Sequence, residues 1–103
     1  MDKIAGLRSF LVMDPKNSLA RYGLAMELAY CGETNAALAE FDQLLTDDPG
    51  YTAGYYMAAQ TLTDAGRIQE AVERLKTGID CATRSGNSHA ASAMQAMLDE
   101  LER

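Results

Sequence analysis

A repeat of 34 residues constrains this chain more than any other feature of its sequence. When residues 18–51 are laid over residues 52–85, small, apolar and turn residues coincide at matched positions. The pairs are Tyr22 with Tyr56, Ala25 with Ala59, Leu28 with Leu62, Gly32 with Gly66, Ala37 with Ala71, Leu38 with Val72, Phe41 with Leu75 and Leu45 with Ile79. Two amphipathic segments that matched by chance would not also align their glycines. The two stretches are therefore expected to be copies of one structural unit.

Each copy is expected to fold into two short helices joined by a glycine turn. Apolar residues recur three and four positions apart on both sides of Gly32 and Gly66, which is typical of helices with one buried face. Glycine readily takes the left-handed conformation that ends many helices. Asp48-Pro49 should stop the first copy, because a residue that precedes proline is pushed out of the helical region. The expected N-caps are Asn17 or Ser18, Thr34 and Thr52.

Further helices are expected on both sides of the repeat. A short one over about Lys3 to Met13 ends at Asp14-Pro15, which aligns with Asp48-Pro49. Its apolar face is Ile4, Leu7, Phe10 and Leu11. The buried stripe of the second helix of residues 52–85 is Ile68, Ala71, Val72, Leu75 and Ile79, and this helix should run through Cys81-Ala82 because no proline stops it. After a turn at residues 85–88, a last helix places Ala90, Ala93, Met94, Met97 and Leu101 on one side.

These features predict an all-α protein of about six helices. Because every connection is short, sequential helices should pack as antiparallel hairpins. The expected organisation is a single domain over residues 1–103, with an N-terminal capping helix in 1–17, repeats at 18–51 and 52–85, and a C-terminal capping helix in 86–103. Hairpins of this kind bury their apolar stripes only by stacking on one another.

The spacing resembles that of the tetratricopeptide repeat family, in particular its small bacterial-type members. The first copy supplies Arg21, Leu24, Ala25, Leu28, Ala37, Phe41 and Pro49 at the family positions, and the second supplies Tyr55, Ala58, Ala59, Leu62, Ala71 and Leu75. Two positions depart from the family pattern: Arg21 replaces an aromatic residue, and Leu44 replaces a small one, whereas Gly78 fills the equivalent site. The resemblance implies a right-handed superhelix of antiparallel helix hairpins.

The same resemblance implies a concave groove, lined by the first helix of each hairpin, that receives peptides. The candidate peptide-binding residues are Tyr22, Met26, Tyr30, Tyr56, Met57, Gln60 and Asp64, with Leu19, Ala29, Ala53 and Thr63 alongside them. Tyr22 and Met26 can instead pack against neighbouring helices, and both interpretations stay open. Family members that clamp a partner's C-terminal carboxylates use cationic groove residues. The matching positions here are Tyr22, Met26, Met57, Asn87 and Ala91, and none is cationic, so that activity does not carry over.

The charge distribution disfavours nucleic acid as a partner. The formal net charge is −6, and no Lys or Arg occurs between Tyr22 and Gly66, whereas phosphate binding needs clustered cations. A neutral to basic protein or peptide is the expected partner. The N-terminal residues lack the apolar segment of a secretory signal, and no apolar run approaches membrane-spanning length. Cys31 and Cys81 lack a CxxC spacing and are expected to be reduced core thiols, so a cytoplasmic location is predicted.

Catalytic motifs are missing from the sequence. The one histidine, His89, lies beside a predicted turn and is expected to be a surface or capping residue. Neither ligands at metal-binding spacing nor a glycine-rich phosphate loop occurs, so we expect no metal, no cofactor and no enzyme activity. The predicted function is a non-catalytic protein–protein interaction module or scaffold. The alternatives are a structural, self-associating (homodimeric) assembly factor and a chaperone-like adaptor.

Overall fold

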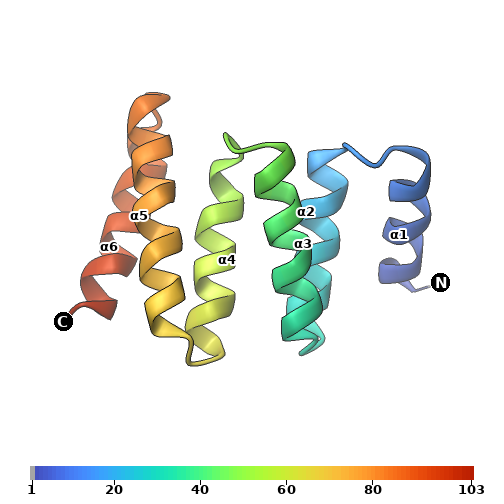
Figure 1. The fold of residues 1–103 in the computed structure, drawn as a ribbon, viewed down its shortest axis with the longest axis horizontal. Helices are drawn as coiled ribbons and strands as arrows, with labels where there is room; N and C mark the ends of the chain where they lie inside the picture. Colours follow the sequence, from blue (N-terminus) through green and yellow to red (C-terminus); the bar gives the residue numbers. More distant parts are fainter. Residues whose placement is uncertain (1) are drawn as a thin grey trace.

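Six α-helices make up the fold of residues 2–103 in the computed structural model; Met1, the first residue of the expected N-terminal capping segment, lies outside the described residues. The helices are α1 (Lys3–Met13), α2 (Ser18–Tyr30), α3 (Thr34–Asp47), α4 (Thr52–Asp64), α5 (Ile68–Arg84) and α6 (Ser88–Leu101). They stand side by side in a row from α1 to α6, each running back along the one before it (Figure 1). The prediction of an all-α fold with about six helices is confirmed.

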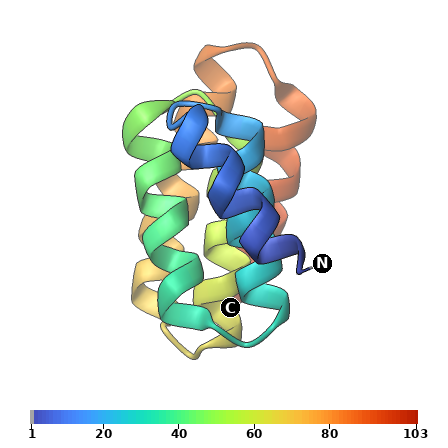
Figure 2. The ribbon, with the colours of Figure 1, turned by 90° about the vertical axis from the view of Figure 1, so that its right-hand side faces the viewer.

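The row of helices has two layers. Seen along the row, α3 and α5 lie on one side, and α2 and α6 lie on the other (Figure 2). Helix α4 contacts both α2 and α6 in addition to its neighbours in the chain, whereas the backbones of α3 and α5 lie farther apart and an ion pair between Asp42 and Arg74 joins them. We therefore call α2, α4 and α6 the inner layer and α3 and α5 the outer layer.

Three turns between helices share one geometry, which glycine makes possible. Gly32, Gly66 and Gly86 have φ of 80°, 78° and 77°, a left-handed conformation that costs glycine little. In each turn the residue after the glycine donates its backbone N–H to a carbonyl five residues back, as in a Schellman motif. These bonds run from Glu33 to Leu28 (2.9 Å), from Arg67 to Leu62 (2.8 Å) and from Asn87 to Ala82 (2.8 Å). The predicted glycine turns are confirmed.

The two Asp-Pro turns are also copies of each other. Asp14 and Asp48 end α1 and α3 with nearly the same backbone angles, φ −139° and ψ 74° against φ −140° and ψ 74°. Each donates its backbone N–H to a carbonyl four residues back. The 34-residue offset inferred from the sequence therefore extends to α1, which occupies the place of a second helix of a hairpin.

The structure explains why Arg21 can replace an aromatic residue. Tyr55, its counterpart in the second repeat, donates its hydroxyl to the carbonyl of Pro49 at 2.7 Å. The Arg21 guanidinium donates to the carbonyl of Pro15 at 3.0 Å and also pairs with Glu40 at 2.6 Å. Both residues thus tie the start of their helix to the preceding Asp-Pro turn.

Small residues allow the helices of each hairpin to approach closely. Ala25 and Ala37 in the first repeat, and Ala59 and Ala71 in the second, are completely buried. Larger side chains fill the space between hairpins, with Phe41 at the centre of one core cluster and Leu75 in the other. Gly78 marks the tightest approach of α5 to its neighbours, because a Cβ atom there would lie 2.6 Å from the Cβ of Tyr55 and 2.6 Å from the Sδ of Met94.

Two of the predicted helix caps are wrong. Asn17 caps α2 as expected, and its side chain accepts a hydrogen bond from the backbone N–H of Ala20 at 2.9 Å. Thr34 and Thr52, however, are the first residues of α3 and α4, and the capping positions belong to Glu33 and Tyr51, whose side chains make no cap hydrogen bond. Each of these helices begins one residue earlier than expected, so the threonine is the first helical residue instead of the N-cap.

Four residues expected in the apolar core are exposed. Cys31 lies in the turn just beyond α2, where the chain has left the helical path, so the buried stripe of α2 ends at Leu28. The other cysteine, Cys81, is half-buried. Both thiols are free. Ile68 is the first residue of α5 and adjoins a turn. Ala93 lines a surface groove, described below. Phe10 matches the buried Leu44, but no helix of the described chain precedes α1 to cover it.

The expected extension of α5 is confirmed, since α5 ends at Arg84.

Candidate functional site

A groove of about 570 Å³ opens on the inner layer, near the N-terminal ends of its helices. One wall comes from α2, the floor from the α3–α4 turn and the first turns of α4, and the other wall from the start of α6. The lining residues are Tyr22, Gly50, Tyr51, Thr52, Ala53, Tyr56, Met57, Asn87, Ala90, Ala93 and Met94. Because the same ends of three helices meet here, the groove is a product of the repeat itself.

Tyr22 belongs to both the core and the groove. Its ring packs edge-on against Phe41, with ring centroids 6.5 Å apart, and tilts against Tyr51 at 5.3 Å. Tyr22 therefore packs against neighbouring side chains and also lines the groove, and its part in peptide binding stays a prediction. Burial raises the pKa of the Tyr22 and Tyr51 hydroxyls above their ordinary value, so both phenols stay neutral hydrogen-bonding groups at neutral pH.

The groove unites three of the seven candidate binding residues, namely Tyr22, Tyr56 and Met57. Met26 is half-buried and packs against the core cluster around Phe41. Tyr30, at the C-terminal end of α2, is 92% exposed and lies outside the groove lining. A part for these two residues in binding stays a prediction.

Gln60 and Asp64, the other two candidates, lie further along α4 and outside the groove lining. The side-chain amide of Gln60 donates to the carboxylate of Asp64 at 2.9 Å, a pairing between consecutive turns of the helix. Their participation in binding is likewise untested and remains a prediction.

Sequence reasoning missed Tyr51 and most of the wall that α6 contributes. Tyr51 directly precedes α4, but it follows the Asp-Pro-Gly turn, and its position in the sequence therefore indicates a turn residue and not a groove residue. The α6 wall was missed because Asn87, the residue that precedes α6, follows Tyr51 by 36 residues rather than 34. The extra length of α5 shifts the repeat frame. Aligning the residues that precede α2, α4 and α6 would have revealed the wall.

The groove carries no charged side chain in its lining. One carboxylate lies at its edge: Asp48 adjoins the turn that supplies Gly50 and Tyr51, and its Oδ2 accepts a hydrogen bond from the Ser18 hydroxyl at 2.8 Å. After burial, the charge of Asp48 is the second reason for the raised pKa of Tyr51. Asn87 is held in the opposite wall because its side-chain oxygen accepts from the N–H of Ala90 at 3.1 Å. The site is thus apolar with hydroxyl groups, and the charge beside its α3–α4 turn is negative.

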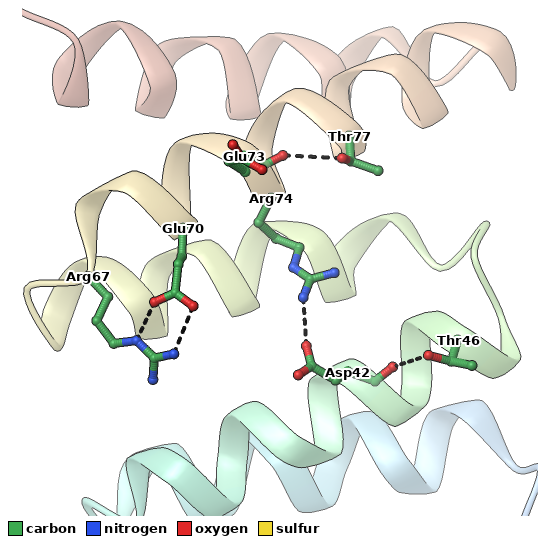
Figure 3. A network of polar contacts seen from close by, with 7 residues as sticks. All are labelled: Asp42, Thr46, Arg67, Glu70, Glu73, Arg74 and Thr77. Carbon is green, nitrogen blue, oxygen red and sulfur yellow. Dashed lines mark hydrogen bonds and ion pairs between the residues drawn. The ribbon is translucent and has the colours of Figure 1, made fainter.

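A second hollow, of about 450 Å³, lies on the outer layer between α3 and α5. Figure 3 shows the polar side chains of this region, where Arg74 of α5 pairs with Asp42 of α3 at 2.6 Å and Arg67 pairs with Glu70. The hydrogen bond from Arg67 holds the pKa of Glu70 below its ordinary value. The arginines of this hollow are paired with carboxylates of the protein itself, and the Arg74–Asp42 pair joins α5 to α3. Fewer free polar groups are therefore available to a ligand here, and the groove on the inner layer is the better candidate for a binding site.

The described residues contain no cluster of potential metal ligands. Within residues 2–103, no group of three or more His, Cys, Asp or Glu side chains is placed to hold a metal ion. His89 is exposed in the first turn of α6, and the cap of that helix is formed by Asn87. None of the described helices is long and apolar enough to cross a membrane.

Comparisons with known proteins agree on one family. The family model "Tetratricopeptide repeat" matches residues 31–98. A TPR repeat-containing protein of Pseudomonas aeruginosa is 27% identical over 100 residues, which cover 97% of this chain and 95% of the relative.

Solved structures show the same fold. A tetratricopeptide repeat domain protein from Salinibacter ruber has a TM-score of 0.81 at 28% identity, covering 85% of this chain and 89% of its own. The TPR2B domain of yeast Sti1, solved as a complex with pHsp70, has a TM-score of 0.89 at 15% identity, covering 96% of this chain and 79% of its own, and is similar in fold alone. The predicted superhelix of antiparallel helix hairpins is confirmed.

Proposed function

Because this chain belongs to the tetratricopeptide repeat family, we propose that it is a non-catalytic interaction module that binds a peptide or protein segment in its inner groove. The fold is typical of protein–protein interaction modules. One observation carries the proposal: three tyrosine rings and two methionines from three helices and one turn converge on a groove of about 570 Å³. Tyrosine rings give large contact areas with few rotatable bonds, and the flexible methionine side chains adapt to a partner's shape.

The position of the groove suits a peptide. Its walls come from three consecutive helices of the inner layer, so an extended segment can lie across their N-terminal ends. The tyrosine hydroxyls can bond the peptide backbone, and the apolar floor can take side chains. We propose a neutral to basic partner, neither nucleic acid nor membrane, because the chain has a net charge of −6 and the groove lining has no cation.

The proposal includes the organisation and location inferred from the sequence. We propose that residues 1–103 form one domain, in which residues 18–51 and 52–85 are the repeats and residues 1–17 and 86–103 are the caps. We also propose a cytoplasmic location.

Fluorescence anisotropy with a labelled peptide library tests the proposed binding. Two variants address the groove: the double change Tyr22→Ala with Tyr56→Ala, and Ala53→Arg, which puts a long charged side chain into the lining. Ala53 is exposed, so this second variant leaves the core intact and separates lost binding from lost folding. Val12→Ala is the control, since Val12 lies on α1, is 80% exposed and is outside the lining.

The expected result is that peptides selected on the wild type lose binding to both groove variants and keep it with the control. Thermal melting of each variant shows whether it is folded. Peptides that bind the wild type and both groove variants equally well would exclude the groove as the binding site.

A second candidate function is self-association through α1. Phe10 and Met13 lie one turn apart on α1 and are 50% and 85% exposed, and Phe10 matches the position of the buried Leu44. Since α1 occupies the place of a second hairpin helix, this is the face that a first helix would cover. Light scattering is the test: a dimer in the wild type that becomes a monomer in Phe10→Ser with Met13→Ser would support this function. A monomeric wild type at high concentration would remove it, and a chaperone-like adaptor would then stay as a variant of peptide binding.

A further inference from the structure

We propose that the groove recognises an arginine side chain of its partner, stacked on the rings of Tyr22, Tyr51 and Tyr56, with the carboxylate of Asp48 nearby. This inference rests on the proposed peptide binding and adds the chemistry of the residue that is bound. It starts from the three rings that line the groove.

The three tyrosines present aromatic surface to the groove. All three are half-buried and all three line it, so part of each ring is open to a ligand. Tyr22 is fixed by its edge-on packing against Phe41, and Tyr51 by its contact with Tyr22 at 5.3 Å with the ring planes 43° apart. Tyr56 stands on α4, in the turn after Thr52. Since two of the rings are held by other rings, a ligand finds a preformed surface.

The electrostatics of this surface favour a cation. The faces of aromatic rings are negative and attract a cation placed within about 6 Å of the ring centroid. No Lys or Arg lines the groove to occupy or repel such a group. Asp48 adds a full negative charge at the edge, and its Oδ2 accepts from a neutral hydroxyl, that of Ser18, rather than from a cation. The net charge of −6 adds a general attraction for positive segments.

Arginine fits this combination better than lysine does. Its guanidinium is planar, is weakly hydrated and stacks on aromatic rings, and its N–H groups can at the same time donate to a carboxylate. The lysine ammonium is compact and strongly hydrated, and it loses more on entering an apolar groove. A leucine or methionine side chain would use the apolar floor but would place no positive charge beside Asp48. The experiment therefore compares these residues directly.

The test begins with a display library of random peptides selected on the wild-type protein. We expect arginine to be enriched among the selected peptides, relative to the starting library and relative to a selection on Tyr51→Leu. The tightest arginine peptide is then made in four versions, with arginine, lysine, citrulline or norleucine at the enriched position. Citrulline keeps the planar shape of arginine but lacks its charge. We expect it to bind about tenfold more weakly, the usual scale of a partly desolvated cation–π contact.

Variants of the protein locate the effect. Tyr51→Phe keeps the ring and should bind the arginine peptide as the wild type does, whereas Tyr51→Leu should lose the preference for arginine over citrulline. Asp48→Asn should reduce that preference, and Val12→Ala, an exposed change on α1 outside the lining, is the control. Melting curves identify any variant that fails to fold.

The outcomes separate the two proposals. Selected peptides that compete for the groove but bind equally well with citrulline or norleucine in place of arginine would overturn the arginine proposal and leave peptide binding intact. Selected peptides that are insensitive to Ala53→Arg would overturn both proposals.

Discussion

Gly78→Ala should destabilise the protein, although the same change stabilises most helix interiors. Gly78 lies inside α5 and is buried. A Cβ atom there would be 2.6 Å from the Cβ of Tyr55 and 2.6 Å from the Sδ of Met94, much closer than real atoms approach. Met94 can move the end of its side chain. Tyr55 cannot yield as easily, because its Cβ is attached to the backbone of α4 and its hydroxyl is bonded to the carbonyl of Pro49 at 2.7 Å.

Two opposing effects set the magnitude. Replacing glycine by alanine inside a helix contributes about 1 kcal/mol to the free energy of unfolding. Overpacking a filled core costs about 1 to 3 kcal/mol. For Gly78→Ala the cost should exceed the gain by about 1 kcal/mol, taking about 2 kcal/mol for the overpacking because one of the two contacts is rigid.

Gly23→Ala is the matched control. Gly23 lies inside α2, and a Cβ there would meet the side chain of Leu7 at 3.7 Å, an ordinary contact. This variant should gain about 1 kcal/mol, so the two variants should differ by about 2 kcal/mol. For a domain of this size that difference corresponds to roughly 8 °C in Tm. Thermal and urea unfolding followed by circular dichroism measure it. If Gly78→Ala raised the Tm as much as Gly23→Ala, the inferred close approach of α4, α5 and α6 would be refuted.

Three further predictions concern charge and protonation. Ala37→Glu should unfold the protein, because a carboxylate would be buried without a partner in a completely buried position; a variant melting within about 2 °C of the wild type would contradict the packing scheme. Arg21→Leu should cost about 2 kcal/mol in urea unfolding, since the mostly buried carboxylate of Glu40 loses its partner; an unchanged urea midpoint would show that the pair contributes nothing. The free energy of unfolding should keep its full value below about pH 10 and fall at higher pH. The reason is that burial raises the pKa of tyrosines such as Tyr22 and Tyr55 in the folded state, so the same tyrosines ionise at lower pH in the unfolded chain. Urea midpoints from about pH 8 to 11 measure that fall, and Tyr55→Phe should flatten it; equal slopes in variant and wild type would exclude this cause.

The features that repeat along the chain could be predicted from the sequence. Glycine turns, Asp-Pro turns and the extension of α5 follow from local backbone preferences, and these act wherever the residue occurs. The buried Ala25–Ala37 and Ala59–Ala71 positions could be predicted too, because each has its copy 34 residues away.

Features that depend on a neighbour, rather than on local preference, escaped prediction. Phe10 has the same place in its helix as Leu44, yet half of it is exposed because the described chain puts no helix against that face. The walls of the groove could not be predicted for a related reason. Tyr51 and Ala93 are 42 residues apart in the chain and line the same groove, because the longer α5 sets the position of α6.

The position of α4 has a consequence for how the chain folds. Within residues 2–103, α4 is the one helix whose backbone closely approaches four others, while the remaining close backbone approaches join helices adjacent in the chain. Proteins dominated by such local contacts fold within microseconds to milliseconds. We expect the folding nucleus to form where α4 meets α3 and α5, with α1 docking last and opening first. The order of folding would then run from the centre of the row outward, and hydrogen exchange should be slowest in α4 and fastest in α1.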